Sequence, residues 1–148
     1  MHLAEITPDN YEAALDLAVR PDQQDLVAPV VKSLAEAYVY GESAWPRLIY
    51  DADRLVGFVM AFLDVPWSTG GRRSGLWRLT IAADAQGQGY GTFAADSVCA
   101  LLHARGEATA YVTYQPRDGG PSAFYDKLGF RPTGELSDSE IVAARQLH

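Results

Sequence analysis

Apolar residues recur at two different spacings along the chain, and the spacing separates predicted helices from predicted strands. Residues 3–6 form a short strand-like run, and Thr7-Pro8-Asp9 is typical of a helix start, with threonine as the cap and proline in the first turn. The residues that follow at helical spacing are Tyr11, Ala14, Leu15, Ala18 and Val19. Pro21 ends this helix, and a second helix is predicted over 29–40, ending at Gly41. Its inward positions are predicted to be Val30, Leu34, Ala37 and Tyr38.

The spacing becomes that of strands after Gly41. Residues 45–50 and 55–63 are predicted strands joined by a polar turn, and residues 76–81 form a third strand after a loop over 66–75 that is rich in glycine, serine and arginine. The remaining predicted elements are a helix over 92–105, a strand over 108–114, a helix over 121–128, and strands over 130–135 and 140–147.

The order of these elements predicts the fold class. An antiparallel group precedes a strand–helix–strand unit, whose two strands should be parallel and joined by a right-handed crossover. We therefore expect an α/β fold with a mixed, twisted central sheet of about seven strands flanked by about four helices. The chain shows no internal repeat and no linker, so residues 1–148 are expected to form a single domain.

Composition narrows the classes of partner. The net charge is −7, and Arg72-Arg73 is too small a basic patch for a nucleic-acid groove, so an amine suits the chain better as a partner. No apolar run approaches the roughly 20 residues that span a membrane, and the N-terminus does not resemble a secretory signal. The single cysteine, Cys99, excludes an intramolecular disulfide. We expect a cytoplasmic protein. The sequence leaves the oligomeric state open, with a homodimer as one alternative.

The segment Gln86-Gly87-Gln88-Gly89-Tyr90-Gly91 lies between a predicted strand and a predicted helix. Unpaired N–H groups at a helix N-terminus bind anions, and glycines let the backbone approach a phosphate closely. A dinucleotide fingerprint would need a third glycine where Thr92 stands, and a phosphate loop would need Gly-Lys-Ser/Thr, which the chain lacks. A pyrophosphate site remains, with a tight turn that serves only backbone geometry as the alternative.

A second segment supports the pyrophosphate site. Residues 121–130, Pro-Ser-Ala-Phe-Tyr-Asp-Lys-Leu-Gly-Phe, together with Gln-x-x-Gly-x-Gly at 86–91, resemble the two signatures of the Gcn5-related N-acetyltransferase (GNAT) superfamily. The resemblance implies the acyl-CoA N-acyltransferase fold, with acetyl-CoA as co-substrate and no metal. The cofactor-binding residues that it implies are Leu79, Thr80, Ile81, Gln86, Gly87, Gln88, Gly89, Tyr90, Gly91 and Thr92.

The resemblance also implies a mechanism. An amine attacks the acyl thioester directly, and Tyr125 donates a proton to the departing thiolate as a general acid; a tyrosine that only makes a structural hydrogen bond is the alternative. Cys99 is expected to be a buried hydrophobe rather than a nucleophile. The chain departs from the family pattern at Asp118, where many members carry asparagine, and at Arg78 and Thr80, where many carry a glutamate base. Glu36, Asp64, Glu140 or an ordered water are left as candidates for the base.

The N-terminal half resembles a spermine/spermidine-acetyltransferase-like branch, through residues 19–23, 33–38 and 55–59. This implies a small-molecule primary amine as the acceptor, with a polyamine-like one as the leading prediction. The acceptor pocket is expected between the first two helices and the loop 66–75. Its candidate residues are Asp22, Gln23, Glu36, Tyr38 and Trp67. A protein N-terminus, an amino acid or an aminoglycoside as acceptor, or a non-catalytic acyl-CoA-binding module, stay open as alternatives.

Overall fold

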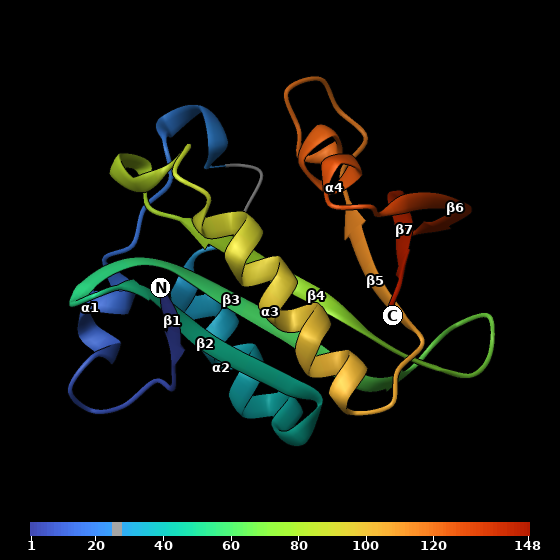
Figure 1. Ribbon diagram of the computed structural model, residues 1–148, viewed down its shortest axis with the longest axis horizontal. Coiled ribbons are helices and arrows are strands. Elements are labelled where there is room, and N and C mark those ends of the chain that lie inside the picture. The colour runs from blue at the N-terminus through green and yellow to red at the C-terminus, as the bar shows by residue number, and fades with distance from the viewer. Residues whose placement is uncertain (25–27) are drawn as a thin grey trace.

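Seven strands form one mixed sheet in the computed structural model, which describes residues 1–24 and 28–148 (Figure 1). Their order across the sheet is β1-β2-β3-β4-β5-β7-β6. The strands are β1 (His2–Ala4), β2 (Ala44–Asp51), β3 (Arg54–Pro66), β4 (Arg72–Ile81), β5 (Thr109–Tyr114), β6 (Arg131–Ser137) and β7 (Glu140–Gln146).

The helices are α1 (Tyr11–Leu15), α2 (Val30–Tyr40), α3 (Tyr90–Ala104) and α4 (Ser122–Lys127), and three short 3-10 turns are η1 (Pro21–Gln23), η2 (Gly41–Ser43) and η3 (Ala83–Ala85). The predicted mixed sheet with about seven strands and about four helices is confirmed. Among the residues that the structure describes, no helix is both long enough and apolar enough to cross a membrane.

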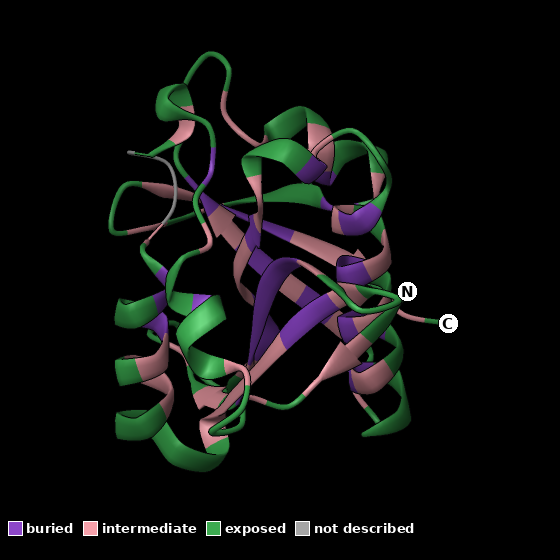
Figure 2. Ribbon diagram, turned by 90° about the vertical axis from the view of Figure 1, so that its left-hand side faces the viewer, coloured by how far each residue is buried: buried purple, intermediate pink, exposed green. Residues whose placement is uncertain are grey.

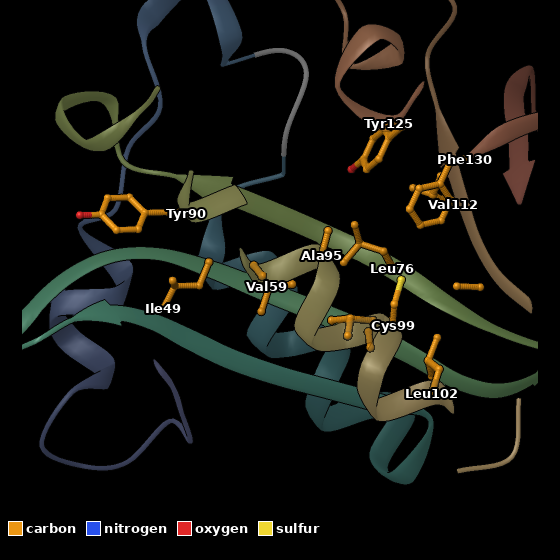
Figure 3. Close-up of a cluster of buried hydrophobic side chains, with 14 of the residues drawn as sticks. Ile49, Val59, Leu76, Tyr90, Ala95, Cys99, Leu102, Val112, Tyr125 and Phe130 are labelled. Carbon is orange, nitrogen blue, oxygen red and sulfur yellow. The ribbon is translucent and has the colours of Figure 1, made fainter. Parts of the chain in front are cut away.

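Apolar residues on the two faces of the sheet form two cores. One face packs against α3 and α4, through Val59, Leu76, Val98 and Phe130 among others. The opposite face packs against α1 and α2, through a smaller cluster centred on Phe58. Figure 2 shows buried residues along the central strands and on the inner sides of the helices, and Figure 3 shows the larger core around α3. The sheet is therefore the middle layer of three.

β4 and β5 are the parallel pair, joined by α3, as the strand–helix–strand pattern predicts. Within the described residues they pair at two positions, Gly75 with Tyr111 and Leu76 with Val112. Beyond these positions the strands diverge, and Figure 1 shows β5 turning away from β4 toward α4. The backbone of β4 from residue 77 onward is thus left without a strand partner on the side facing β5.

A β-bulge in β4 decides which side chains face α2. Opposite β3, Met60 pairs with Arg78 and Ala61 with Leu76, so Trp77 is the extra residue. Such a bulge turns two successive side chains toward the same face of the sheet. Trp77 accordingly packs against the Phe58 cluster, and Arg78 reaches Glu36 of α2.

Several predicted boundaries or orientations are wrong, among them the end of the first helix, because α1 stops at Leu15 and does not include Ala18 and Val19. α1 begins at Tyr11 rather than at residue 7, because Asn10 accepts a hydrogen bond from the Thr7 N–H (2.8 Å) and donates one to the carbonyl of residue 5, which holds 7–10 as a turn. Tyr38 points outward and is 90% exposed. β4 begins at Arg72, because the long strand β3 extends to residue 66 and pairs with residues that looked like loop.

Candidate functional site

A cavity of about 640 Å³ occupies the gap between the diverging strands β4 and β5. Its lining combines residues from both faces of the sheet, with Arg78 on the α2 face and Tyr125 from α4 on the opposite face. The lining consists of Val19, Gln23, Trp77, Arg78, Leu79, Thr80, Ile81, Ala85, Gln86, Gly87, Gly89, Tyr90, Gly91, Thr92, Thr113, Tyr114, Gln115, Gly119, Gly120, Pro121, Phe124, Tyr125, Lys127 and Glu140. Two reactants that enter from opposite faces can therefore meet within it.

The glycine turn forms the α3 side of this cavity. Gly87 and Gly89 have φ angles of 77° and 87°, a conformation that glycine adopts without strain, and a Cβ built on either meets no atom within 4 Å. Gly89 caps α3, so the unpaired N–H groups of the first helical turn and the positive end of the helix dipole face the cavity. Open space beside these N–H groups fits a phosphate group.

Two side chains of the turn fix its shape, and Gln86 also lines the cavity. The Gln86 amide donates to the carbonyl of Ile81 (3.1 Å) and to Oε1 of Gln23 (2.7 Å), which ties the turn to the end of β4 and to η1. Gln88 accepts a bond of 3.4 Å from the Tyr90 hydroxyl and, in the described part of the chain, is not among the cavity residues. Gln86 and Gln88 thus act through the geometry of the turn.

The turn between β2 and β3 supports the glycine turn from behind. The Tyr90 hydroxyl donates a hydrogen bond of 2.5 Å to the carboxylate of Asp51, and Arg54 contacts both the carbonyl (3.2 Å) and the carboxylate (3.5 Å) of Asp84. The bond to Asp51 raises the pKa of Tyr90, which keeps the phenol protonated as the donor. In Figure 3 the Tyr90 ring points away from Tyr125. Its side chain therefore anchors the turn, and its backbone faces the cavity.

Tyr125 lies on the buried side of α4, at the cavity wall. Its ring stacks on Tyr114 with centroids 5.7 Å apart and makes edge contacts with Phe124 and Phe130. Burial raises the pKa of Tyr125 well above its ordinary value, so the phenol is protonated at neutral pH. Figure 3 shows its oxygen directed away from Phe130. The arrangement presents a neutral hydroxyl donor to the cavity.

The predicted acceptor residues are not gathered in one place. Gln23 lines the cavity, whereas the lining drawn from the described residues does not include Asp22, Glu36, Tyr38 or Trp67. Asp22 forms an exposed ion pair with Arg20 (3.4 Å). Glu36 lies one step behind the cavity wall, where it accepts two bonds of 3.1 and 3.2 Å from Arg78.

Trp67 lies at the far end of β3 and β4, in the hairpin that joins them. It stacks between Phe62 and Tyr111, and Arg73 packs over its ring at 4.7 Å. The expectation that the segment 66–75 helps to form the acceptor pocket therefore does not fit the structure, because the extension of both strands carries this hairpin away from the cavity.

The three carboxylates that the sequence offers as candidate bases lie in different parts of the structure. The Asp64 carboxylate pairs with Arg72 (3.1 Å) in the same distant hairpin, where the Asp64 backbone N–H also donates to the Ser74 hydroxyl, and Glu36 is engaged by Arg78. Glu140 lines the cavity at the start of β7, where it accepts a bond of 3.1 Å from Gln115. Of the three carboxylates, Glu140 is the one that lines the cavity.

Lys127 lines the cavity from the last turn of α4, although the sequence motifs do not point to it. The signal was its position two residues after Tyr125, which puts a cation on the same short helix. Gly119 and Gly120, in the loop before α4, also line the cavity. Within the described residues, no group of three or more His, Cys, Asp or Glu side chains is arranged to hold a metal.

Several solved structures of other proteins superpose on nearly the whole of this chain. Among solved structures, an acetyltransferase from Thermus thermophilus superposes with a TM-score of 0.76 at 24% identity, covering 99% of this chain and 96% of that one. The PaiA N-acetyltransferase of Thermoplasma acidophilum, solved with coenzyme A, gives 0.73 at 10% identity, covering 98% of each chain. Arabidopsis thaliana Naa50, bound to the bisubstrate analogue CoA-Ac-MVNAL, gives 0.68 at 21% identity, covering 97% of each chain.

A comparison of the sequence with curated proteins gives no match. The model of the acetyltransferase (GNAT) family, however, matches residues 7–130, a span that contains both the glycine turn and Tyr125. Together with the glycine turn at the start of α3 and the gap between β4 and β5, this match shows that the chain belongs to the acetyltransferase (GNAT) family.

Proposed function

We propose that the protein transfers an acetyl group from acetyl-CoA to a primary amine of a small molecule by direct attack. The observation that carries this proposal is the cavity between β4 and β5, which has the N-terminus of α3 at one end and the buried Tyr125 in its wall. An acyl-CoA needs both a phosphate site and a place for its thioester beside a proton donor, and the cavity combines them.

The cofactor would occupy the α3 side of the cavity. Its pyrophosphate would accept hydrogen bonds from the backbone of residues 87–92, which offer N–H groups and open space. Its pantetheine arm carries amide groups, and these match the unpaired edge of β4 at Leu79, Thr80 and Ile81. Lys127 would supply positive charge to a phosphate. Because acidic residues outnumber basic ones and the net charge is −7, backbone N–H groups are especially suited to bind the anionic pyrophosphate in this protein.

The reaction forms an N–C bond and breaks the C–S bond of the thioester. The neutral amine attacks the carbonyl carbon, the amine nitrogen loses one proton, and the thiolate sulfur gains one. Because burial raises the pKa of Tyr125 above that of a thiol, complete transfer of the phenol proton to a thiolate is uphill. Tyr125 would therefore stabilise the developing thiolate by a hydrogen bond and pass on a proton only as it receives another from the attacking amine.

The acceptor must reach the thioester as a free amine. In this proposal Glu140, or a water that it orients, takes the proton from an ammonium group; the support is that Glu140 is the candidate carboxylate in the cavity wall. Orientation of the two bound reactants would supply a large part of the rate enhancement. The cytoplasmic location and the polyamine-like acceptor expected from the sequence, as well as a homodimer, remain predictions beside this proposal.

The proposal is tested by cofactor binding and by the variant Tyr125→Phe. Millimolar acetyl-CoA should raise the Tm, because a ligand that binds the native state stabilises it. Tyr125→Phe should lower kcat by about one hundredfold, with the Kd for acetyl-CoA changed less than about twofold, because the ring remains in place. Thermal scans with and without acetyl-CoA measure the Tm and report on binding, and a free-thiol assay with a panel of amines measures kcat.

Tyr111→Phe serves as the matched control, because Tyr111 lies on β5 in the distant Trp67 cluster. It should leave kcat within about twofold of the original value, since no reacting group is near it. Unchanged turnover in Tyr125→Phe would remove the tyrosine from the chemistry. Absence of thiol release with every amine, despite binding of acetyl-CoA, would favour a non-catalytic acyl-CoA-binding module.

A further inference from the structure

Arg78 places a positive charge in the wall of the cavity on the α2 face, where an acceptor would enter opposite the cofactor. The β-bulge at Trp77 turns Arg78 toward this face, since Arg78 pairs with Met60 of the α1–α2 core. Its side chain is 24% exposed and lines the cavity. An incoming acceptor therefore meets a guanidinium group close to the gap between β4 and β5.

The guanidinium is held in a fixed orientation but keeps unused donors. Its Nη2 donates to both carboxylate oxygens of Glu36, and its Nη1 donates to the carbonyl of Trp77 at 3.3 Å. The Cζ atom of Arg78 lies 5.3 Å from the centroid of the Trp77 ring. A guanidinium has five N–H donors. Nε is buried and has no partner among the described residues, so an acceptor in the cavity would meet the N–H groups of the two Nη atoms instead. A guanidinium held in this way is suited to bind a carboxylate.

Arg73, on the same strand, shows what a purely structural pair looks like in this protein. It pairs with Glu135 at 3.1 Å, like Arg78 with Glu36, but aromatic rings flank it at 4.7 Å (Trp67) and 4.2 Å (Tyr111). In the described part of the chain, Arg73 is not among the cavity residues. Both guanidinium groups have a buried nitrogen without a partner among the described residues, Nη1 in Arg73 and Nε in Arg78, so the difference between them is that Arg78 lines the cavity.

We propose that Arg78 binds a carboxylate of the acceptor, so that the acceptor is an amino acid rather than a polyamine; this inference rests on the acyl transfer proposed above. The guanidinium holds the carboxylate, and the amine of the same molecule lies beside Glu140 and the thioester. Arg78 and Glu140 present one charge of each sign to the cavity, while Glu36 pairs with Arg78 behind the wall, and this arrangement complements a zwitterion. A polycation would place an ammonium group against the guanidinium.

The test compares acceptors that differ only in the carboxylate. The pairs are ornithine with putrescine, lysine with cadaverine, and each remaining amino acid that has a stable decarboxylated amine, assayed by thiol release from acetyl-CoA. We expect the carboxylate member of the preferred pair to have a kcat/KM at least about tenfold higher. Arg78→Gln should reduce that advantage to less than about threefold, and Arg78→Lys, which keeps the charge without the planar fork, should fall between.

Arg73→Gln is the matched control, because it removes the same kind of half-buried ion pair away from the cavity. It should lower the Tm without changing the preference for the carboxylate member. A preference for putrescine or cadaverine in the unmodified protein would overturn the inference even if Arg78→Gln does not fold, as would an equal loss of both activities in Arg78→Gln. Turnover of amines without any carboxylate advantage refutes this inference alone, whereas no turnover of any amine refutes the acyl transfer as well.

Discussion

Gly75 lies at the point where β4 and β5 touch before they diverge, directly opposite Tyr111. A Cβ added at Gly75 would stand 1.9 Å from the carbonyl oxygen of Tyr111 and 2.8 Å from the ring of Phe62. Ordinary contacts begin at 3.4 Å, so the two strands would have to separate by about 1.5 Å. Overpacking costs about 1–3 kcal/mol when side chains can adjust. Here the clashing atom is backbone, and the pairing with β5 is lost as well, so Gly75→Ala should destabilise by about 3 kcal/mol or more.

Urea unfolding followed by circular dichroism measures this change, and a thermal scan should show a Tm lower by about 6–12 °C. Gly91→Ala is the control for adding a methyl group to glycine. Its Cβ would meet the ring of Phe124 at 3.2 Å, a side chain that can shift, and alanine favours the helix, so its stability should change by less than about 1 kcal/mol. Equal stability of Gly75→Ala and the unmodified protein would refute the account of how β4 and β5 are joined.

Two further predictions concern groups that hold the site and the far end of the sheet. Tyr90→Phe removes the bond to Asp51 that anchors the glycine turn, so initial-rate measurements should show the KM for acetyl-CoA raised about three- to tenfold with kcat little changed; an unchanged KM would contradict this anchoring role. The hydrogen bond from Arg73 holds the pKa of Glu135 below its usual 4.5. Stability from this pair is thus present above about pH 4.5 and is lost as the pH falls through the lowered pKa. In urea titrations at pH 7 and pH 3, Glu135→Gln should differ from the unmodified protein more at pH 7, and an equal difference at both pH values would count against the pair.

Most elements of the fold follow from local patterns, and the exceptions depend on distant partners. The strand over residues 76–81 and the helix after the glycine turn are encoded by their own apolar spacing. Residues 72–74 look like a loop by composition, yet they are strand because β3 offers them a partner as far as Pro66. Tyr38 follows the helical spacing but lies on the outer face of α2, because α2 covers the sheet through residues such as Leu34 and Ala37.

The residues of the site also divide into those that local sequence predicts and those that depend on distant partners. The glycine turn and Tyr125 could be found from sequence because each belongs to a contiguous segment with its own chemistry. The acceptor side could not, because it depends on the bulge at Trp77, which exists only in the register between β3 and β4. That register turns Arg78 toward α2 and occupies Glu36, which the sequence presents as a free carboxylate. The position of Trp67 could not be predicted for a similar reason, since the length of the β3–β4 hairpin sets the distance of Trp67 from the cavity.

The short contact between β4 and β5 has a consequence for how the molecule behaves without its donor. Strands β1 to β4 form one half of the sheet and β5 to β7 the other, and two paired positions connect them across the backbone. A pantetheine arm lying along β4 would act as a substitute for the missing part of the ladder. Within residues 77–81, the amide protons that point toward the gap rather than toward β3 should therefore exchange quickly in the free protein and slowly when acetyl-CoA is bound. The donor would then be a structural component of the sheet as well as a reactant, and it would add to the packing against α3 that joins the two halves in the free protein.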